Sequence, residues 1–160
     1  MSVEVVLGLG SNLGDKQKYL ELAISEMKKN NLIENVVLSS VHQTKAVLLK
    51  DSPPEWDLDF LNMAIRGTTK LLPTELIKAI KAIEKKIGRK HAATWAPREI
   101  DIDILAYGDE YIDNELRIPH KFLLERSWAI GPLAEIYPEW KYPVPGLYFQ
   151  LTAKEIVSKL

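Results

Sequence analysis

The chain has 160 residues, of which 46% are apolar, with 21 basic and 22 acidic side chains and a formal net charge of −1. These values suit one compact domain, here residues 1–160. They lack the excess of basic residues expected of a protein that binds a nucleic-acid backbone or an anionic membrane. Cysteine is absent, no apolar run approaches the roughly 18 residues of a membrane span, and the first residues lack a signal-peptide pattern, so we expect a soluble, cytoplasmic protein without disulfides or thiolate chemistry.

The first strand is predicted over residues 3–9, which are β-branched and alternating, and it ends at the glycine-rich stretch GLGSNLGDK, residues 8–16. This stretch lacks the spacing of a Walker loop, and it lacks the third glycine of G-x-G-x-x-G because Leu13 stands there. It is therefore interpreted as a strand-to-helix turn of another kind. A helix is predicted from Asp15 until Asn30 stops it.

The middle of the chain continues with strand character. Residues 33–49 predict a long or interrupted strand, residues 51–57 a loop, and residues 58–70 a further strand. Pro73 suits the first turn of a second helix, whose apolar stripe recurs at helical spacing until Gly88.

A basic loop follows at residues 89–98, and then EIDIDILAYG at 99–108, the cleanest strand pattern in the chain. A hairpin is predicted around Gly108 and Asp109, and helical pieces over residues 121–136 and 152–160. The order βαββαβ predicts an α+β fold with a ferredoxin-like core and a C-terminal extension, in which helices cover one face of a mainly antiparallel sheet.

Two carboxylates stand out within the strand at 99–108. Because side chains alternate along a strand, Asp101 and Asp103 share one face, opposite Ile100, Ile102 and Ile104. Their Cβ atoms are expected about 6–7 Å apart, which suits a magnesium half-site completed by water and substrate phosphates. A bare D-x-D pair is more often only a solvated strand face.

The neighbouring arginines favour a phosphate site. Arg89 and Arg98 flank the loop before the two acids, and a guanidinium can bind phosphate through two parallel hydrogen bonds. The alternative is that these arginines simply pair with the nearby acids, Glu99 included.

A second cluster suits a flat heterocycle. Phe60 and Asn62 share a strand face, so that an aromatic ring stands beside a carboxamide, although Phe60 alone is more typical of a core residue. His120, Arg126 and Trp128 follow later in the chain. The three histidines show no metal-ligand spacing, so no zinc site is predicted.

Together, GLGSNLGD, FLN, IEKKIGR, WAPREIDIDIL, IPHKFLLERSW and GPLAEI resemble the 6-hydroxymethyl-7,8-dihydropterin pyrophosphokinase family over essentially the whole chain. The resemblance implies transfer of pyrophosphate from ATP to a pterin alcohol in folate biosynthesis, with release of AMP. It also implies two Mg²⁺ ions, ATP as co-substrate, no nucleic-acid or membrane partner, and fusion to or association with other folate-pathway enzymes.

The resemblance assigns site residues by position. It implies that Asp101 and Asp103 hold the metal ions and act in catalysis with Arg89 and Arg98. ATP is expected to be bound by Glu84, Arg89, Trp95, Arg98, Ile104, His120 and Arg126. The pterin is expected to be bound by Thr44, Ala46, Phe60, Asn62 and Trp128.

The chain departs from the family pattern at four places: TKAV at residues 44–47, Lys81, Thr94 and Lys121. Two other readings of the residues remain open. One is a ferredoxin-like small-molecule-binding module without chemistry, and the other is a D-x-D metal-dependent nucleotidyltransferase, which would release pyrophosphate. Release of AMP in the presence of ATP, Mg²⁺ and the reduced pterin would support the pyrophosphokinase interpretation over both alternatives.

Overall fold

The computed structural model describes residues 1–89 and 96–160. Its central sheet has the strand order β2-β4-β1-β5, with β3 also paired to β4, and all of these pairings are antiparallel. The strands are β1 (Val3–Ser11), β2 (Glu34–Leu38), β3 (His42–Thr44), β4 (Phe60–Thr69) and β5 (Asp101–Tyr107). The predicted ferredoxin-like βαββαβ core is confirmed.

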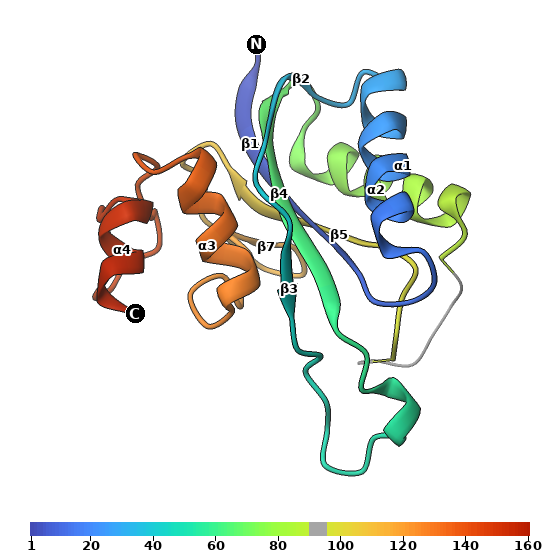
Figure 1. The fold of residues 1–160 in the computed structure, drawn as a ribbon. Helices are drawn as coiled ribbons and strands as arrows, with labels where there is room; N and C mark the ends of the chain where they lie inside the picture. The colour runs from blue at the N-terminus through green and yellow to red at the C-terminus, as the bar shows by residue number, and fades with distance from the viewer. Residues whose placement is uncertain (90–95) are drawn as a thin grey trace.

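Helices lie on both faces of this sheet (Figure 1). The helices α1 (Lys16–Lys29) and α2 (Pro73–Ile87) cover one face, and α3 (Ser127–Ile136) and α4 (Ala153–Lys159) lie on the other. Helices were predicted on one face only, and that part of the prediction was wrong. Apolar residues of β1, β4 and β5, among them Val6 and Ala64, pack with α3 and α4 in a second core.

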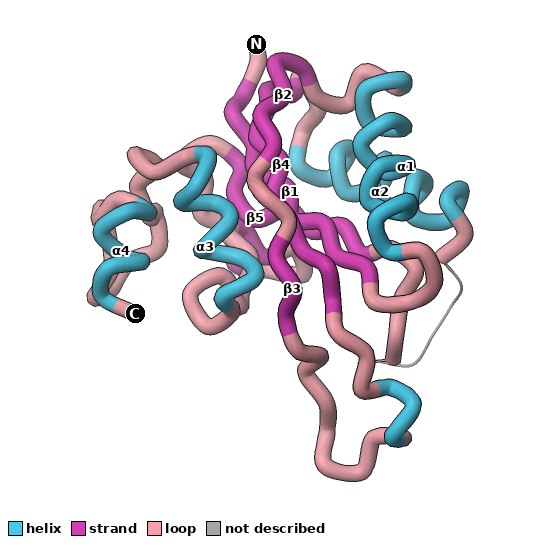
Figure 2. The backbone as a smooth tube through the Cα atoms, viewed as in Figure 1, coloured by secondary structure: helices cyan, strands magenta, loops and turns pink. Residues whose placement is uncertain are grey.

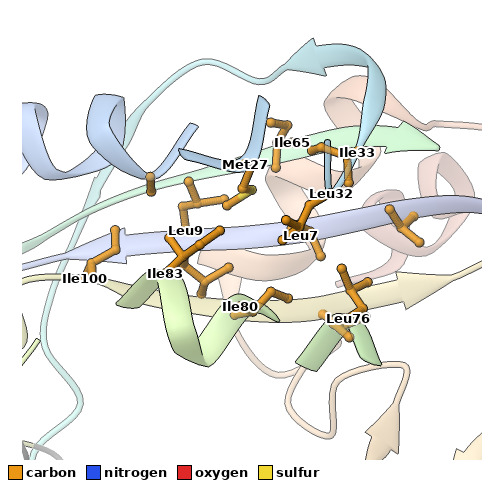
Figure 3. Close-up of a cluster of buried hydrophobic side chains, with 14 of the residues drawn as sticks. Leu7, Leu9, Met27, Leu32, Ile33, Ile65, Leu76, Ile80, Ile83 and Ile100 are labelled. Atoms are coloured by element: carbon orange, nitrogen blue, oxygen red, sulfur yellow. The ribbon is translucent and has the colours of Figure 1, made fainter. Parts of the chain in front are cut away.

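The residues predicted to begin α1 and to begin and end α2 do so in the structure. Asp15 caps α1, since its carboxylate accepts the backbone N–H of Lys18 at 3.2 Å. Pro73 opens α2, and Gly88 ends it with φ of 123°, a value that favours glycine. The apolar stripes of both helices meet β1 and β4 in a continuous buried cluster (Figure 3).

The connection between β3 and β4, residues 45–59, extends away from the sheet and contains only the short helix η1 (Pro54–Trp56) (Figure 2). The strand predicted over residues 33–49 is interrupted, because β2 ends at Leu38 and β3 begins at His42. Both strands pair with β4, so one long strand neighbours two short ones.

Strand β5 confirms the predicted alternation and then breaks it. Ile102 and Ile104 pack under α1 and α2, on the face opposite the two aspartates. The pairing with β1 shifts between Val6 and Leu7, and the bulge sends both Leu105 and Ala106 to the face of α3 and α4.

Two predicted elements were wrong in detail. No hairpin forms at Gly108 in the described chain. Gly108 instead donates its N–H to the carbonyl of Glu4, and the hairpin lies later, between β6 (Ile112–Asp113) and β7 (Arg117–Ile118). The helical piece predicted from residue 121 begins only at Ser127. Among the described helices, none is long and apolar enough to cross a lipid bilayer.

Candidate active site

A cavity of about 110 Å³ opens on the sheet face that carries α3. It is bounded by β1, β4, β5 and the segment before α3, together with the start of the β3–β4 connection. The lining residues are Gly8, Leu9, Gly10, Lys45, Val47, Phe60, Asn62, Ala96, Arg98, Asp101, Asp103, Phe122, Arg126 and Trp128. Apart from Arg89, the residues of the predicted acid and arginine cluster and of the predicted aromatic and amide cluster thus line one cavity.

Two glycines of β1 make the floor of the cavity. Gly8 lies opposite Asp103 and Gly10 opposite Asp101 in the pairing with β5, and Gly10 lies opposite Asn62 in the pairing with β4. A Cβ at Gly10 would stand 2.7 Å from Asn62 Oδ1, closer than packing allows. A Cβ at Gly8 would stand 3.1 Å from Leu105 Cδ2. These glycines therefore make room for the side chains of Asn62 and Leu105, a role that the interpretation of the stretch as a turn missed.

Asp101 is held by both arginines. Arg89 Nη1 lies 3.1 Å from Asp101 Oδ1, and Arg98 Nη1 lies 3.2 Å from Oδ2. Buried Glu84 accepts from Arg89 Nη1 at 2.8 Å and from the backbone N–H of Ile102 at 2.8 Å. The alternative in which the arginines pair with nearby acids is therefore realised in part, with Asp101 as their shared partner.

Asp103 has a different environment. Among the described residues, no lysine or arginine lies within ion-pair distance of Asp103, and the His120 ring is the nearest basic group recorded, with Nε2 3.9 Å from Oδ2. Burial, reinforced by the negative charge of Asp101, raises the pKa of the Asp103 carboxyl to about 7. The site therefore has excess negative charge at Asp103, which a bound cation would offset.

His120 is oriented by the chain that follows it. Its Nδ1 accepts the backbone N–H of Phe122 at 3.1 Å, so the neutral ring carries its proton on Nε2, toward Asp103. Burial lowers the pKa of His120, with the charges of Lys121 and Arg126 acting in the same direction and that of Asp101 opposing. The imidazole is therefore a neutral donor beside Asp103, which lines the cavity.

The donor set fits magnesium better than a metal that needs a complete protein cage. Within residues 1–89 and 96–160, no group of three or more His, Asp or Glu side chains is arranged to hold a metal ion. Mg²⁺ commonly uses one or two carboxylates and takes its other ligands from water and phosphate. Asp101 and Asp103, which share one face of β5, supply such a pair.

The other half of the cavity is aromatic and amide-bearing. Phe60 and Asn62 come from β4, and Trp128 from the first turn of α3. Asn62 is buried and donates through Nδ2 to Thr44 Oγ1 on the neighbouring strand β3. The Trp128 ring packs edge-on to His120, with centroids 5.6 Å apart. The aromatic side of the cavity thus contacts, through Trp128, the histidine that lies beside Asp103.

Asn12 joins the segments on either side of the cavity. Its Oδ1 accepts the backbone N–H of Arg98 at 2.8 Å, and its Nδ2 donates to the carbonyl of Leu58 at 3.1 Å. One buried amide thereby braces the start of β4 against the arginine-bearing segment.

Some predicted residues lie elsewhere. The side chain of Ile104 is buried in the core under α1 and α2, so only its backbone is available to a ligand. Ala46 stands between Lys45 and Val47, which line the cavity in its place. Trp95 lies outside the described residues. Phe122 lines the cavity but was missed, although an aromatic residue two positions after His120 was a usable signal.

Comparison with known proteins identifies relatives over most of the chain. Residues 6–138 match the family described as 7,8-dihydro-6-hydroxymethylpterin-pyrophosphokinase. A 2-amino-4-hydroxy-6-hydroxymethyldihydropteridine pyrophosphokinase of Aquifex aeolicus is 43% identical over 141 residues, which cover 88% of this chain and 84% of the relative. A folate synthesis bifunctional protein of Chlamydia muridarum is 44% identical over 137 residues, 84% of this chain but 30% of the relative.

The fold has solved counterparts as well. The structure of wild-type Plasmodium falciparum HPPK-DHPS with pteroate aligns over 99% of this chain and 44% of its own length, with a TM-score of 0.72 and 17% identity. At that identity the likeness concerns the fold. The chain spans about a third of the length of the bifunctional relatives that it matches.

Proposed function

The chain belongs to the 7,8-dihydro-6-hydroxymethylpterin-pyrophosphokinase family, whose members use ATP as co-substrate, and we propose that it transfers a pyrophosphoryl group from ATP to 6-hydroxymethyl-7,8-dihydropterin. The products are the pterin diphosphate and AMP. One observation carries the proposal: a single cavity has an aromatic and amide wall on one side and a wall of acids and arginines on the other.

The aromatic wall suits the pterin. Phe60 and Trp128 line the cavity from different elements, so a flat ring can stack between them. The Asn62 amide, held by Thr44, matches the amide-like edge of the heterocycle. Lys45 and Val47 close this side from the β3–β4 connection.

The charged wall suits the triphosphate of ATP. Arg89 and Arg98 each contact Asp101 through Nη1, so their other N–H groups remain available to phosphate oxygens. Arg126 and His120 extend this set of donors along the segment before α3. We assign Arg89, Arg98, Asp101 and Asp103 to catalysis and Glu84 to holding Arg89 in place.

We assign two Mg²⁺ ions to Asp101 and Asp103. Bound magnesium would neutralise phosphate charge and favour ionisation of the alcohol. The residues of the chain would hold the pterin hydroxymethyl oxygen opposite the β-phosphorus. The alcohol proton passes to water, an O–P bond forms at that phosphorus, and the bond from it to the bridging oxygen, which leaves with AMP, breaks. The arginines stabilise the charge that develops on the phosphate oxygens.

The bifunctional relatives contain far more chain than this sequence covers. We propose that residues 1–160 act as one pterin pyrophosphokinase domain that works beside other enzymes of folate biosynthesis.

The experiment is a product assay with ATP, Mg²⁺ and reduced 6-hydroxymethylpterin. We expect AMP and pterin diphosphate in equal amounts, and no AMP when the pterin is left out. Asp103→Asn is the control for a contaminating activity. Release of pyrophosphate would support a nucleotidyltransferase, and binding of pterin without turnover would support a binding module.

A further inference from the structure

Arg126, which lines the cavity with Arg98, is held differently from Arg89 and Arg98. Arg89 and Arg98 are each within 3.2 Å of a carboxylate oxygen of Asp101. The guanidinium carbon of Arg126 lies 4.9 Å from the centre of the Phe122 ring. Among the described residues, no carboxylate lies within ion-pair distance of Arg126.

Phe122 is well placed to act on its neighbours. Its ring lines the cavity, and its backbone N–H donates to His120 Nδ1 at 3.1 Å. Lys121 Nζ also lies 4.9 Å from the ring centre, and the His120 ring lies 5.9 Å away. One aromatic ring thus stands among two cations and an imidazole.

The two ways of holding an arginine differ in charge. A carboxylate orients a guanidinium but cancels its charge, whereas the face of an aromatic ring attracts it and leaves the charge intact. The Phe122 ring occupies none of the five N–H donors of Arg126. An arginine held in this way keeps its full charge and donors for an anionic ligand.

We propose that Phe122 is a positioning residue for the reaction: its ring holds the Arg126 guanidinium over the cavity, where it binds the polyphosphate of the nucleotide. The inference rests on the proposed function, because it assumes that a polyphosphate enters this cavity. It assigns Phe122 to the nucleotide and not to the pterin.

The test is calorimetric binding to the whole chain, with three probes measured separately: magnesium tripolyphosphate, a nonhydrolysable ATP analogue and the reduced pterin. Phe122→Leu should weaken binding of both phosphate probes by roughly three- to tenfold and leave pterin affinity unchanged. Phe122→Tyr, which keeps an aromatic face, should bind both phosphate probes as tightly as the unchanged protein does. Phe149→Leu is the matched control, since Phe149 is exposed and lies away from the cavity.

A double-mutant cycle tests whether Phe122 acts through Arg126. In an Arg126→Gln background, Phe122→Leu should cause no further loss of tripolyphosphate affinity. Fluorinated phenylalanines at position 122 keep the shape of the side chain while weakening the negative face of the ring, so affinity should fall as fluorination rises. If Phe122→Leu does not fold, this fluorinated series still tests the role of the Phe122 ring.

The outcomes separate the inference from the proposed function. Absence of ATP-analogue binding by the unchanged protein would overturn the proposed function and this inference with it. Normal binding that is unaffected by Phe122→Leu or by fluorination would overturn the inference alone. It would also be overturned by a loss confined to the ATP analogue, which indicates stacking on the base, or by a loss confined to the pterin.

Discussion

The two faces of the central sheet use the same strands for opposite purposes. On the face of α1 and α2, Leu7 and Leu9 of β1 are buried in a continuous apolar core (Figure 3). On the face of α3, Val6 joins the second core, whereas the following alternate positions Gly8 and Gly10 have no side chains and line the cavity. One strand thus packs one layer along its length and lines a ligand-sized cavity on the other face, because its side chains alternate.

The two faces of the sheet contribute differently to the stability of the fold and to the chemistry of the site. Burying each large apolar side chain on the closed face contributes about 1.5–3 kcal/mol. On the open face, Asp103 is kept in a partly buried site where its charge is unfavourable. Changes on the closed face should therefore affect folding, and changes at the residues that line the cavity on the open face should affect ligands and turnover.

The largest expected effect is on the open face. Asp103→Asn removes a carboxylate charge with little change in volume, so turnover should fall at least roughly a thousandfold while the fold remains. Steady-state AMP production across a range of Mg²⁺ concentrations measures this. Near-native activity at any of these concentrations would show that Asp103 holds no essential metal.

On the closed face, Ile80→Ala should lower the free energy of unfolding by about 2–5 kcal/mol, because Ile80 is fully buried in the core of α1 and α2. Urea denaturation of the ligand-free protein is the measurement. Val157→Ala is the matched control at a more exposed helical position, with an expected change within about 0.5 kcal/mol. Pterin affinity of the folded fraction should not change.

Gly10→Ala tests the floor of the cavity. The new methyl group would overlap Asn62 Oδ1, so the amide must move, and pterin affinity should fall about tenfold, or 1.4 kcal/mol. Gly131→Ala in α3 is the control, since a methyl group there meets open space. Equal affinities for the two variants would mean that the cavity floor does not determine pterin binding.

The smallest expected effect is the pH dependence of the ligand-free protein in EDTA. The folded pKa of Asp103, about 7, lies above its unfolded value near 4, so the folded state holds the proton more tightly. Stability from this group is complete below about pH 4 and is lost as the pH rises to 7. Asp103→Asn should therefore be more stable than the unchanged protein above pH 7 and equal to it near pH 4. The full pKa difference corresponds to about 4 kcal/mol, but the Asp103 side chain is 26% exposed and solvent screens its charge, so we expect a difference of about 1 kcal/mol.

Thermal unfolding at pH 4.5, 6 and 8 measures this difference. A stability gain that is independent of pH would mean that the charge of Asp103 is not what the open face disfavours.

Much of the architecture follows from local patterns in the sequence. Period-two and helical spacing predict the order βαββαβ, Asp15 and Gly88 mark helix ends, and the alternation at residues 99–108 places Asp101 and Asp103 on one face. These features depend on neighbouring residues and backbone geometry alone, so the sequence by itself determines them.

Other features required distant segments to meet. Pairing between β1 and β5 places Gly8 and Gly10 beside the aspartates, and the bulge at Leu105 depends on that register. The choice of Asp101 as the partner of both arginines depends on where α2 ends relative to β5. The placement of Phe122 depends on how the segment before α3 crosses the open face. No local pattern encodes these contacts, because each is decided by packing between elements far apart in the chain.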